Sequence, residues 1–329
     1  MNRNRSLGGL AVAPIGLGCM SLTGAFGEAT VKQAEETLKR AFDLGVTLFD
    51  SANAYGGGEN ERLLGRVLGP VREKIAISTK FGFVVKDGKP SVDGSPEQVE
   101  GRCNESLKRL GVEYIDLYFL HRPDPSVPIE ETVGAMSRLV DSGKVRYLGL
   151  CEVSAENLRK AHSIHPISAV QSEYSLFHRI QERSVLPACR ELDIGFVPYS
   201  PIGRGILTGT ISREEDVPQK HDMRATMPRF QGKNLTANLR MIEELVLLAK
   251  KYSAKPSQIA LAWLLAQGEH IVPIPGTKKV AYLEENLAAA DIALDPSVLT
   301  HLNQSFNPER VMGERYGMSW QESADAKDY

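Results

Sequence analysis

Four side chains in this sequence could together transfer a proton to a carbonyl group. Asp50, Lys80 and His121 each end a short apolar run, and Tyr55 follows Asp50 in the stretch LFDSANAYGGGENERLLG. A phenol can donate its proton to a carbonyl oxygen, but its usual pKa of about 10 must fall toward neutrality for efficient transfer. A neighbouring ammonium group stabilises the phenolate, so we expect Lys80 to lower the pKa of Tyr55.

The other two side chains would support this pair. The carboxylate of Asp50 can hold Lys80 in place and keep it charged despite burial. His121 can donate a hydrogen bond to the carbonyl or couple to the phenol. Gly56 to Gly58 allow a tight turn and leave room for a substrate beside the hydroxyl of Tyr55. Each residue alone also fits a structural role, in a salt bridge, a satisfied backbone carbonyl or a turn, but the four together favour catalysis.

The elements that must position these residues follow a repeating pattern. Short runs rich in Val, Ile, Leu and Phe alternate with longer segments of helical period, which is typical of βα units around a parallel sheet. The strands are expected at residues 14–20, 47–50, 75–80, 115–121, 145–151, 169–174, 195–201 and 271–276. The helices are expected at residues 31–44, 59–68, 96–110, 129–142, 154–164, 179–192, 237–252, 256–267 and 278–290.

This alternation, without a break in composition, favours one closed barrel over an open doubly wound sheet. We therefore expect a single α/β domain over residues 1–329, a (β/α)8 TIM barrel with an N-terminal β-hairpin and extra loops and helices at its C-terminal face. Active sites of such barrels lie at the carboxyl ends of the strands, where Asp50, Lys80 and His121 would meet. The polar stretch from about 205 to 236 predicts a lid or binding loop, with a solvated insertion as the alternative.

Composition limits the possible partners. The 39 Lys and Arg nearly balance the 41 Asp and Glu, so no overall field favours nucleic acid or anionic lipid. No apolar run reaches the roughly 20 residues that a membrane span needs, and the N-terminus has no apolar core of a secretion signal. The four cysteines lack metal-ligand spacing, and His162 and His165 lack further ligands. We expect a cytoplasmic protein with free thiols and no metal.

Six segments then suggest a family. The stretches LFDSANAYGGGENERLLG, ISTKFG, IDLYFLHRPDP, AVQSEYSLF, VPYSPIGRGIL and PIPGTKKVAYLEENL resemble, in this order, successive signatures of the aldo-keto reductase superfamily. The resemblance runs nearly end to end and implies the (β/α)8 fold, an extended nicotinamide cofactor and the tetrad Asp50, Tyr55, Lys80 and His121. The RF...NL segment and the late ERY are most similar to the branch with bacterial and plant reductases.

The resemblance also implies how a cofactor is held. No GxGxxG fingerprint occurs. Tyr199 is implied to stack on the nicotinamide, the backbone amides around Arg204 to cradle the pyrophosphate, and the helix start at Thr277 and Lys278 to bind a 2′-phosphate, hence NADPH rather than NADH. The expected cofactor contacts are Gly18, Met20, Asp50, Cys151, Glu152, Gln171, Tyr199, Ser200, Pro201, Gly203, Arg204, Gly205, Leu207, Gly276, Thr277, Lys278, Tyr282, Glu285 and Asn286.

Three positions depart from the pattern that the family commonly shows. Cys151 and Glu152 stand where relatives commonly carry Ser or Asn, and a thiol is a weak donor, so we expect weaker anchoring of the carboxamide there. Tyr282 stands where the family often has Arg, which removes one charge at the adenosine phosphate but permits stacking on adenine. Glu285 and Asn286 match the positions that bind the adenine amino group.

The predicted function is the reversible NADPH-dependent reduction of aldehydes or ketones to alcohols. The expected substrate walls are Met20, Phe26, Tyr55, Phe83, His121 and Phe177, with the lid around Met227 to Phe230, which favours a hydrophobic carbonyl compound. One alternative is a barrel lyase that forms a Schiff base on Lys80, which needs a lowered lysine pKa. Another is a cofactor-binding regulatory subunit with little turnover. The sequence gives no signal for the oligomeric state.

Overall fold

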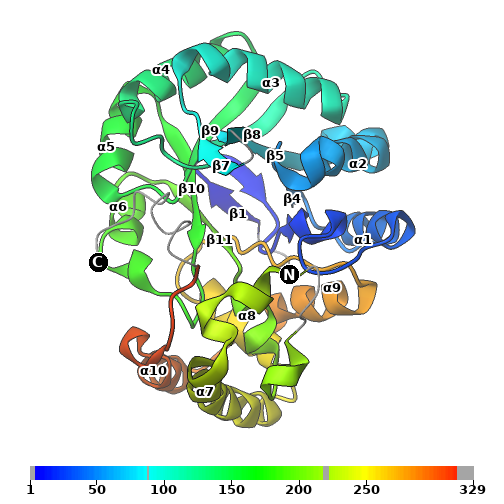
Figure 1. Cartoon of the computed structure of the whole chain (residues 1–329), viewed down its shortest axis with the longest axis vertical. Helices are drawn as coiled ribbons and strands as arrows, with labels where there is room; N and C mark the ends of the chain where they lie inside the picture. Colours follow the sequence, from blue (N-terminus) through cyan, green and yellow to red (C-terminus); the bar gives the residue numbers. More distant parts are fainter. Residues whose placement is uncertain (1–3, 87–88, 218–221, 317–329) are drawn as a thin grey trace.

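The sheet of this protein consists of parallel strands that curve into a barrel (Figure 1). The computed structural model describes residues 4–86, 89–217 and 222–316. Seven strands are paired in parallel, in the order β3, β4, β5, β8, β9, β10, β11. Their bounds are β3 Leu17–Gly18, β4 Leu48–Asp50, β5 Ala76–Phe81, β8 Ile115–Leu120, β9 Val145–Cys151, β10 Ile167–Glu173 and β11 Gly195–Tyr199.

The expected eighth strand, residues 271–276, closes the barrel without forming a regular ladder. One end of this segment bridges in parallel to Phe196 on β11, and the other end bridges to Gly18 on β3. Pro273 and Pro275 lack the N–H groups that a continuous ladder needs, so the segment donates to β11 only from Val272 and Ile274, which alternate with the prolines. The barrel topology is therefore confirmed, and the eighth strand exists as an irregular pairing segment.

Helices surround the barrel on its outside (Figure 1). Their bounds are α1 Val31–Asp43, α2 Glu59–Leu68, α3 Pro96–Leu110, α4 Ile129–Asp141, α5 Ala155–Ile164, α6 Val185–Glu191, α7 Gly232–Lys251, α8 Pro256–Leu265, α9 Val280–Leu287 and α10 Pro296–Ser305. The helix expected at 179–192 is divided into a 3-10 turn, Ile180–Glu182, and α6. Helix α10 was not expected from the sequence.

The remaining strands form two antiparallel hairpins. The expected N-terminal hairpin pairs β1, Arg5–Leu7, with β2, Leu10–Val12, and its Leu7 is fully buried in the barrel interior. A second hairpin, β6 Phe83–Lys86 with β7 Lys89–Val92, follows β5 and was not expected. It matters for the site because it carries Phe83 to the carboxyl face of the barrel.

Side chains fill the barrel interior. The inner cluster contains Leu7, Val12, Leu48, Ala76, Leu117, Phe119, Cys151, Ala169, Val197, Val272 and Ile274. Gly149 is required here because a Cβ at this position would lie 2.4 Å from the ring of Phe119. The barrel is therefore a packed core rather than a pore, and space for a ligand remains at the ends of the strands.

The polar stretch from 205 to 236 is folded against the barrel in the parts that the structure describes. It contains the end of the 3-10 segment Gly203–Thr208 and three further short 3-10 turns, and helix α7 begins at Gly232 rather than at the expected 237. Its apolar side chains Ile206, Leu207, Ile211, Val217, Met227 and Phe230 are buried. These described parts are thus not a solvated insertion, because their apolar residues pack into the core.

Candidate active site

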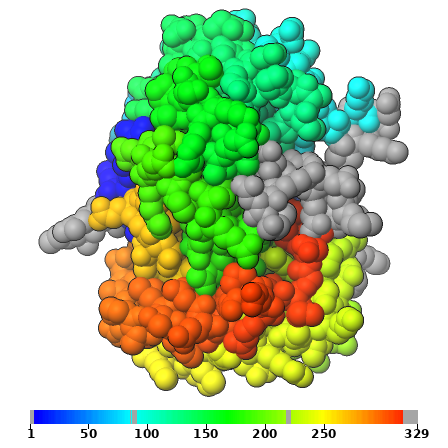
Figure 2. All heavy atoms as spheres, turned by 90° about the vertical axis from the view of Figure 1, so that its left-hand side faces the viewer, coloured from blue at the N-terminus to red at the C-terminus, as the bar shows by residue number. Residues whose placement is uncertain are grey.

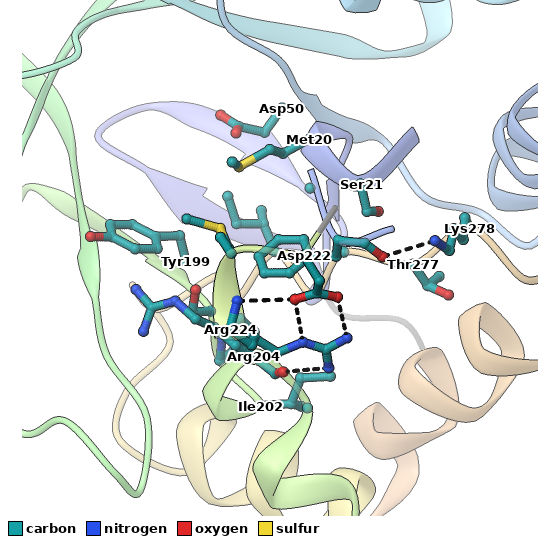
Figure 3. Close-up of a pocket in the computed structure, with 18 of the residues that line it drawn as sticks. Met20, Ser21, Asp50, Tyr199, Ile202, Arg204, Asp222, Arg224, Thr277 and Lys278 are labelled. Carbon is teal, nitrogen blue, oxygen red and sulfur yellow. Dashed lines mark hydrogen bonds and ion pairs between the residues drawn. The ribbon is translucent and has the colours of Figure 1, made fainter. Parts of the chain in front are cut away.

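A cavity of about 1510 Å³ opens at the carboxyl ends of the strands. Asp50 and Met20 lie at one end of it, the ring of Tyr199 lies along one wall, and Thr277 and Lys278 lie at the opposite end (Figure 3). The strand ends supply the residues of the floor, since a parallel barrel brings all its carboxyl ends together. The residues that line the cavity extend from the end of β4 to the start of α9.

Three of the predicted catalytic side chains are in direct contact at the floor of the cavity. The Nζ of Lys80 lies 2.6 Å from a carboxylate oxygen of Asp50, 2.6 Å from the carbonyl oxygen of Ser51 and 3.4 Å from the hydroxyl of Tyr55. Lys80 itself is fully buried behind the cavity wall. Lys80 therefore meets the cavity through two residues that line it, Asp50 and the phenol of Tyr55.

The carboxylate of Asp50 is held by two further donors. Its other oxygen accepts hydrogen bonds from the hydroxyl of Ser78 at 2.7 Å and from the amide of Gln171 at 2.9 Å. These bonds fix the rotamer of Asp50, and with it the position of the ammonium group of Lys80.

His121 stands beside the phenol. Its ring centroid lies 6.0 Å from that of Tyr55 and 4.4 Å from that of Phe83, in both cases edge to face. Burial, helped by the nearby charges of Lys80 and Arg122, holds the pKa of His121 well below its usual value. The imidazole is therefore neutral at pH 7, and it can donate one N–H without carrying a charge.

The acidity of the phenol differs from the sequence-based expectation. Burial raises the pKa of Tyr55 to about 12, and the opposing effect of Lys80 does not overcome it. The expected fall toward neutrality was wrong for the protein without ligands, because the depth of the side chain outweighs one neighbouring cation. The consequence favours reduction, since Tyr55 keeps its proton throughout the neutral range.

Lys80 keeps its positive charge at neutral pH. Burial works against its ammonium form, but Asp50 and the phenol of Tyr55 more than compensate, so its pKa lies above the usual value. A Schiff-base nucleophile needs the opposite shift, because only the unprotonated amine attacks a carbonyl.

The three glycines after Tyr55 are explained by the backbone. Gly56 and Gly57 have φ angles of +57° and +63°, which side-chain-bearing residues rarely adopt, and a Cβ on Gly58 would lie 2.6 Å from Arg109. This turn lets helix α2 begin directly after the phenol. Asn60, in the first turn of α2, then accepts a hydrogen bond from Ser51 at 2.7 Å and ties the turn to the end of β4.

Comparison with known proteins identifies the family of this chain. Residues 14–306 match the model of the aldo/keto reductase family. The chain belongs to this family. It is 48% identical to "Probable aldo-keto reductase 1" of Glycine max over 312 residues, which cover 94% of this chain and 89% of that protein. It is 41% identical to the aldo-keto reductase yakc of Schizosaccharomyces pombe, whose name includes NADP(+), over 95% of this chain and 94% of the relative.

Solved structures of the family agree with the fold. A glycerol dehydrogenase from Gluconobacter oxydans superposes with a TM-score of 0.84 at 28% identity, over 93% of this chain and 96% of the other. The thermostable aldo-keto reductase Tm1743, solved with the inhibitor epalrestat, superposes with a TM-score of 0.74 at 29% identity, over 92% and 99% of the two chains. Among the described residues, no helix is long and apolar enough to cross a membrane, and no cluster could hold a metal ion.

Most residues expected to hold the cofactor face the cavity. These residues are Gly18, Met20, Asp50, Gln171, Tyr199, Ser200, Pro201, Arg204, Gly205, Gly276, Thr277, Lys278, Tyr282, Glu285 and Asn286. Of the expected substrate walls, Met20, Phe26, Tyr55, Phe83 and His121 face it as well. The family motifs therefore identify one continuous surface.

The remaining residues lie elsewhere. Among the described residues, Cys151, Glu152, Gly203 and Leu207 are not part of the cavity lining. The N–H groups of Gly203 and Leu207 donate to carbonyls inside their own loop, so they are not available to a phosphate. Phe177 packs edge-on against Phe306 at 5.8 Å in the core. In the lid, Phe230 is buried away from the cavity, whereas Met227 lines it.

The thiol of Cys151 gives a direct test of this correction. Cys151 is buried in the inner cluster of the barrel, and burial raises its pKa to about 12. Replacing it by Ser is expected to leave the NADPH dissociation constant unchanged, because the thiol does not face the ligand space. Fluorescence titration checks this result, and a large loss of affinity would instead place the thiol against the cofactor.

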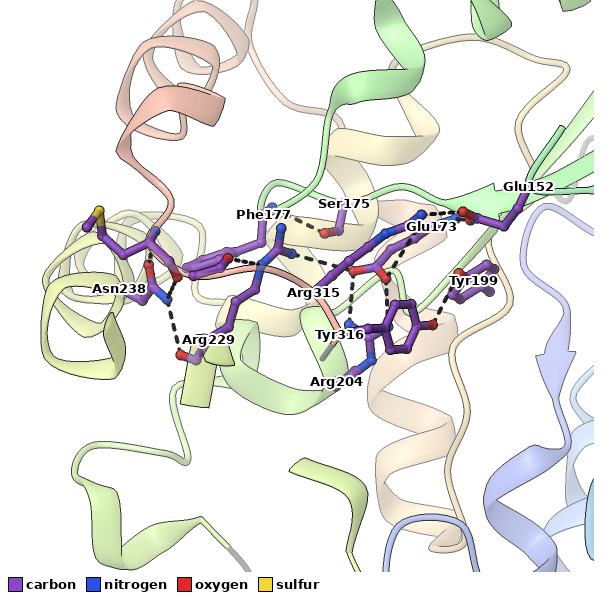
Figure 4. Close-up of polar contacts among 12 residues, drawn as sticks. Glu152, Glu173, Ser175, Phe177, Tyr199, Arg204, Arg229, Asn238, Arg315 and Tyr316 are labelled. Carbon is purple, nitrogen blue, oxygen red and sulfur yellow. Dashed lines mark hydrogen bonds and ion pairs between the residues drawn. The ribbon is translucent and has the colours of Figure 1, made fainter. Parts of the chain in front are cut away.

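Glu152 belongs to a network of buried charges rather than to the cavity (Figure 4). It adopts a left-handed φ of +49° directly after β9, and its carboxylate accepts hydrogen bonds from Arg315 and from the backbone of Glu173. Glu173 in turn accepts two bonds from Arg204, at 3.0 and 2.6 Å. We refer to Glu152, Glu173, Arg204, Arg229 and Arg315 as the arginine network.

The arginine network limits what the side chain of Arg204 can bind, whereas the predicted role of its backbone is not affected. Its guanidinium is paired with Glu173 and buried, so its charge is committed to holding the loop after β11 rather than open to a pyrophosphate. Arg224 also lines the cavity, where it is paired with Asp222 and donates to the carbonyl of Arg204 at 3.2 Å (Figure 3). Asp222 and Arg224 lie in the polar stretch without hydrophobic periodicity, so sequence patterns did not single out this pair.

The C-terminal segment forms part of the same wall. Arg315 joins the arginine network, and the hydroxyl of the next residue, Tyr316, lies 3.3 Å from that of Tyr199 (Figure 4). Asn238 on α7 holds the preceding backbone at Met312 through two hydrogen bonds of 2.9 Å. In the space-filling view this red segment lies between the orange α10 region and the yellow α7 region (Figure 2).

At the other end, Lys278 connects two loops. Its Nζ donates to the carbonyl oxygens of Phe26 at 2.9 Å and Glu28 at 2.7 Å. Phe26 also bridges to Asp222 in the lid. The loop after β3 and the lid therefore meet across the cavity, where one lysine from the start of α9 anchors the junction (Figure 3).

Buried histidines make stability depend on pH. Burial lowers the pKa of His178 to about 3 and that of His121 well below its usual range. In the unfolded chain both bind protons below a pH of about 6.5, so stability is fully present above that pH and is lost as the pH falls. Between about pH 7 and pH 5 we expect a loss of about 1–2 kcal/mol for each histidine, measured by denaturant unfolding.

The variant His178→Asn should reduce this pH dependence, whereas His301→Asn, at an exposed position of α10, should not. A pH dependence that is identical in the wild type and in His178→Asn would contradict the assignment of a neutral buried imidazole.

Proposed function

We propose that the protein reduces aldehydes or ketones to alcohols, reversibly, with NADPH as the reductant and Tyr55 as the general acid. The observation that carries this proposal is the contact of 3.4 Å between Lys80 and a phenol that faces a large open cavity. A structural salt bridge would not need a phenol between the buried lysine and the cavity. The NADP(+) in the name of the yeast relative supports the choice of cofactor.

The cavity residues fit a dinucleotide. The hydroxyl of Ser21 lines the cavity and is buried without a described hydrogen-bond partner, which leaves a polar group for a ligand. Tyr199 offers a ring at the barrel end, and the left-handed residues Ser200, Arg204 and Gly205 turn their backbone along the middle of the cavity. When bound, the nicotinamide cofactor supplies the hydride that reaches the carbonyl carbon.

The residues proposed to hold this cofactor follow from the cavity lining. Gln171 and Tyr199 would contact the nicotinamide end, and Ser200, Gly205 and Arg224 would border the pyrophosphate. Glu285 and Asn286 would border the adenine end; Glu285 is fixed by hydrogen bonds from Ser257 and Gln258.

Preference for NADPH over NADH is proposed from the start of α9. Thr277, Lys278 and Lys279 precede the first turn, where unpaired N–H groups and the helix dipole favour an anion. Because the ammonium of Lys278 is committed to two carbonyl oxygens, Lys279 is the cation that remains for a phosphate. It lies 5.1 Å from the ring centroid of Tyr282, so a phosphate and an adenosine could meet at this pair.

Side chains of the protein itself then supply the proton. The hydroxyl of Tyr55 gives its proton to the carbonyl oxygen as negative charge develops there. The ammonium of Lys80 stabilises the phenolate that forms, and Asp50 keeps that ammonium charged and in place. The neutral imidazole of His121 can donate a hydrogen bond to the same oxygen and orient it. In the oxidation direction the same groups accept the proton.

A panel of aldehydes and ketones, each assayed with NADPH and with NADH, tests the proposal. We expect steady consumption of NADPH with simple aromatic aldehydes and slower consumption of NADH. Tight cofactor binding without turnover would support a regulatory subunit instead. Trapping of a substrate adduct on Lys80 by borohydride would support a lyase, which the raised pKa of Lys80 disfavours.

A further inference from the structure

Arg122 is a buried cation in the wall of the cavity, and neither the family motifs nor the proposed mechanism gives it a role. It follows His121 directly, faces the cavity and is only 8% exposed. Tyr199 and Tyr316 are close enough to influence its charge, so it lies at the catalytic end of the cavity rather than at the α9 end.

The guanidinium of Arg122 is held on one side only. Its Nη1 donates to the carbonyl oxygen of His121 at 2.8 Å, and its central carbon lies 5.5 Å from the ring centroid of Phe83. Among the described residues, Nε is buried without a hydrogen-bond partner. Nε and Nη2 form one edge of the planar fork, the edge that binds a carboxylate with two parallel hydrogen bonds.

No described carboxylate neutralises this charge at ion-pair distance. Glu152 acts on Arg122 electrostatically, but its carboxylate is bonded to Arg315, and Glu173 in the same arginine network is bonded to Arg204. Glu173 also has Arg229 at 3.6 Å and Arg315 at 3.8 Å. Two carboxylates therefore already serve three guanidinium groups, and Arg122 is a fourth. A buried charge without a partner is costly, so an anion from outside the chain would be bound favourably.

We propose that Arg122 binds a carboxylate of the substrate, so that the preferred substrates are aldehydes or ketones with an apolar body and a carboxylate group. This inference rests on the proposed reductase function and narrows its substrate class. The ring of Phe83 beneath the guanidinium and the ring of Tyr316 beside it suit an aromatic or similar flat body. The hydrophobic substrate expected from the sequence is thereby extended by one anionic group.

The test compares substrates that differ only in this charge. The wild-type enzyme is assayed with NADPH and with meta- and para-formylbenzoate, and each is matched with the neutral formylbenzamide of the same shape. We expect kcat/KM to be at least tenfold higher for the better formylbenzoate than for its amide, since a charge-assisted pair contributes about 1.4 kcal/mol or more. The Arg122→Gln variant should reduce this ratio to near one, and Arg122→Lys should retain part of it.

A matched control removes a positive charge elsewhere. Arg66→Gln changes an exposed ion pair with Glu35 on the outside of the barrel, and the ratio should stay as in the wild type. Equal kcat/KM for acid and amide in the wild type would overturn the proposal without requiring any variant. A loss of NADPH affinity in Arg122→Gln that slows both substrates equally would assign Arg122 to the cofactor and would also overturn it. Absence of NADPH consumption with every carbonyl compound would reject the reductase function itself.

Discussion

Replacing Tyr55 by Phe is expected to lower kcat by on the order of 10²- to 10⁴-fold, the range for loss of a general acid. The change removes one hydroxyl, the group that lies 3.4 Å from the ammonium of Lys80. The ring, its edge contact with His121 and the cavity wall remain. NADPH affinity, measured by fluorescence titration, should therefore stay close to that of the wild type while turnover falls.

A matched change of the same type serves as the control. Tyr114→Phe removes a phenol hydroxyl near Glu73, on a residue outside the cavity, and kcat should not change. If Tyr55→Phe kept wild-type turnover, the proton would come from another donor, and the assignment of Tyr55 would be wrong.

Replacing Glu173 by Gln is expected to lower the free energy of unfolding more than any other substitution that we propose. Gln keeps the size of the side chain but removes the charge that pairs with Arg204 and faces Arg229 and Arg315. Removal of one partner from a buried ion pair typically costs about 3–5 kcal/mol, because the remaining charges stay desolvated. The free energy of unfolding in denaturant and the thermal midpoint measure this loss.

NADPH affinity should fall in the same variant, since Arg204 holds the loop that borders the middle of the cavity. Glu100→Gln is the control, because Glu100 forms its ion pair with Lys144 at the surface. An equal thermal midpoint for Glu173→Gln and Glu100→Gln would show that the arginine network does not stabilise the fold.

The positions of the proposed catalytic side chains could be predicted from the sequence because they depend on topology. Asp50 and Lys80 end apolar runs, and parallel strands in a barrel must deliver such residues to one face. The eighth strand was predicted at residues 271–276, but its irregular pairing was not, since Pro273 and Pro275 remove donors from a segment that still pairs on both sides.

The errors have physical reasons as well. The pKa of Tyr55 depends on burial, which a sequence does not show, so the influence of Lys80 was overestimated. Phe177 was expected among the substrate walls, but packing against Phe306 places it in the core. Arg122 and Arg224 lie in polar segments without periodicity, and only the folded chain shows what surrounds them.

The transfer of hydride to a carbonyl carbon at this site can be measured directly. The protein is incubated with an aromatic aldehyde and NADPH that carries deuterium at both positions of the reactive ring carbon, and the product is analysed by mass spectrometry. The account predicts an alcohol with one deuterium on its carbinol carbon, formed by the wild type and almost absent with Tyr55→Phe. An aldehyde recovered unchanged from the wild type, or an alcohol without the label, would contradict it.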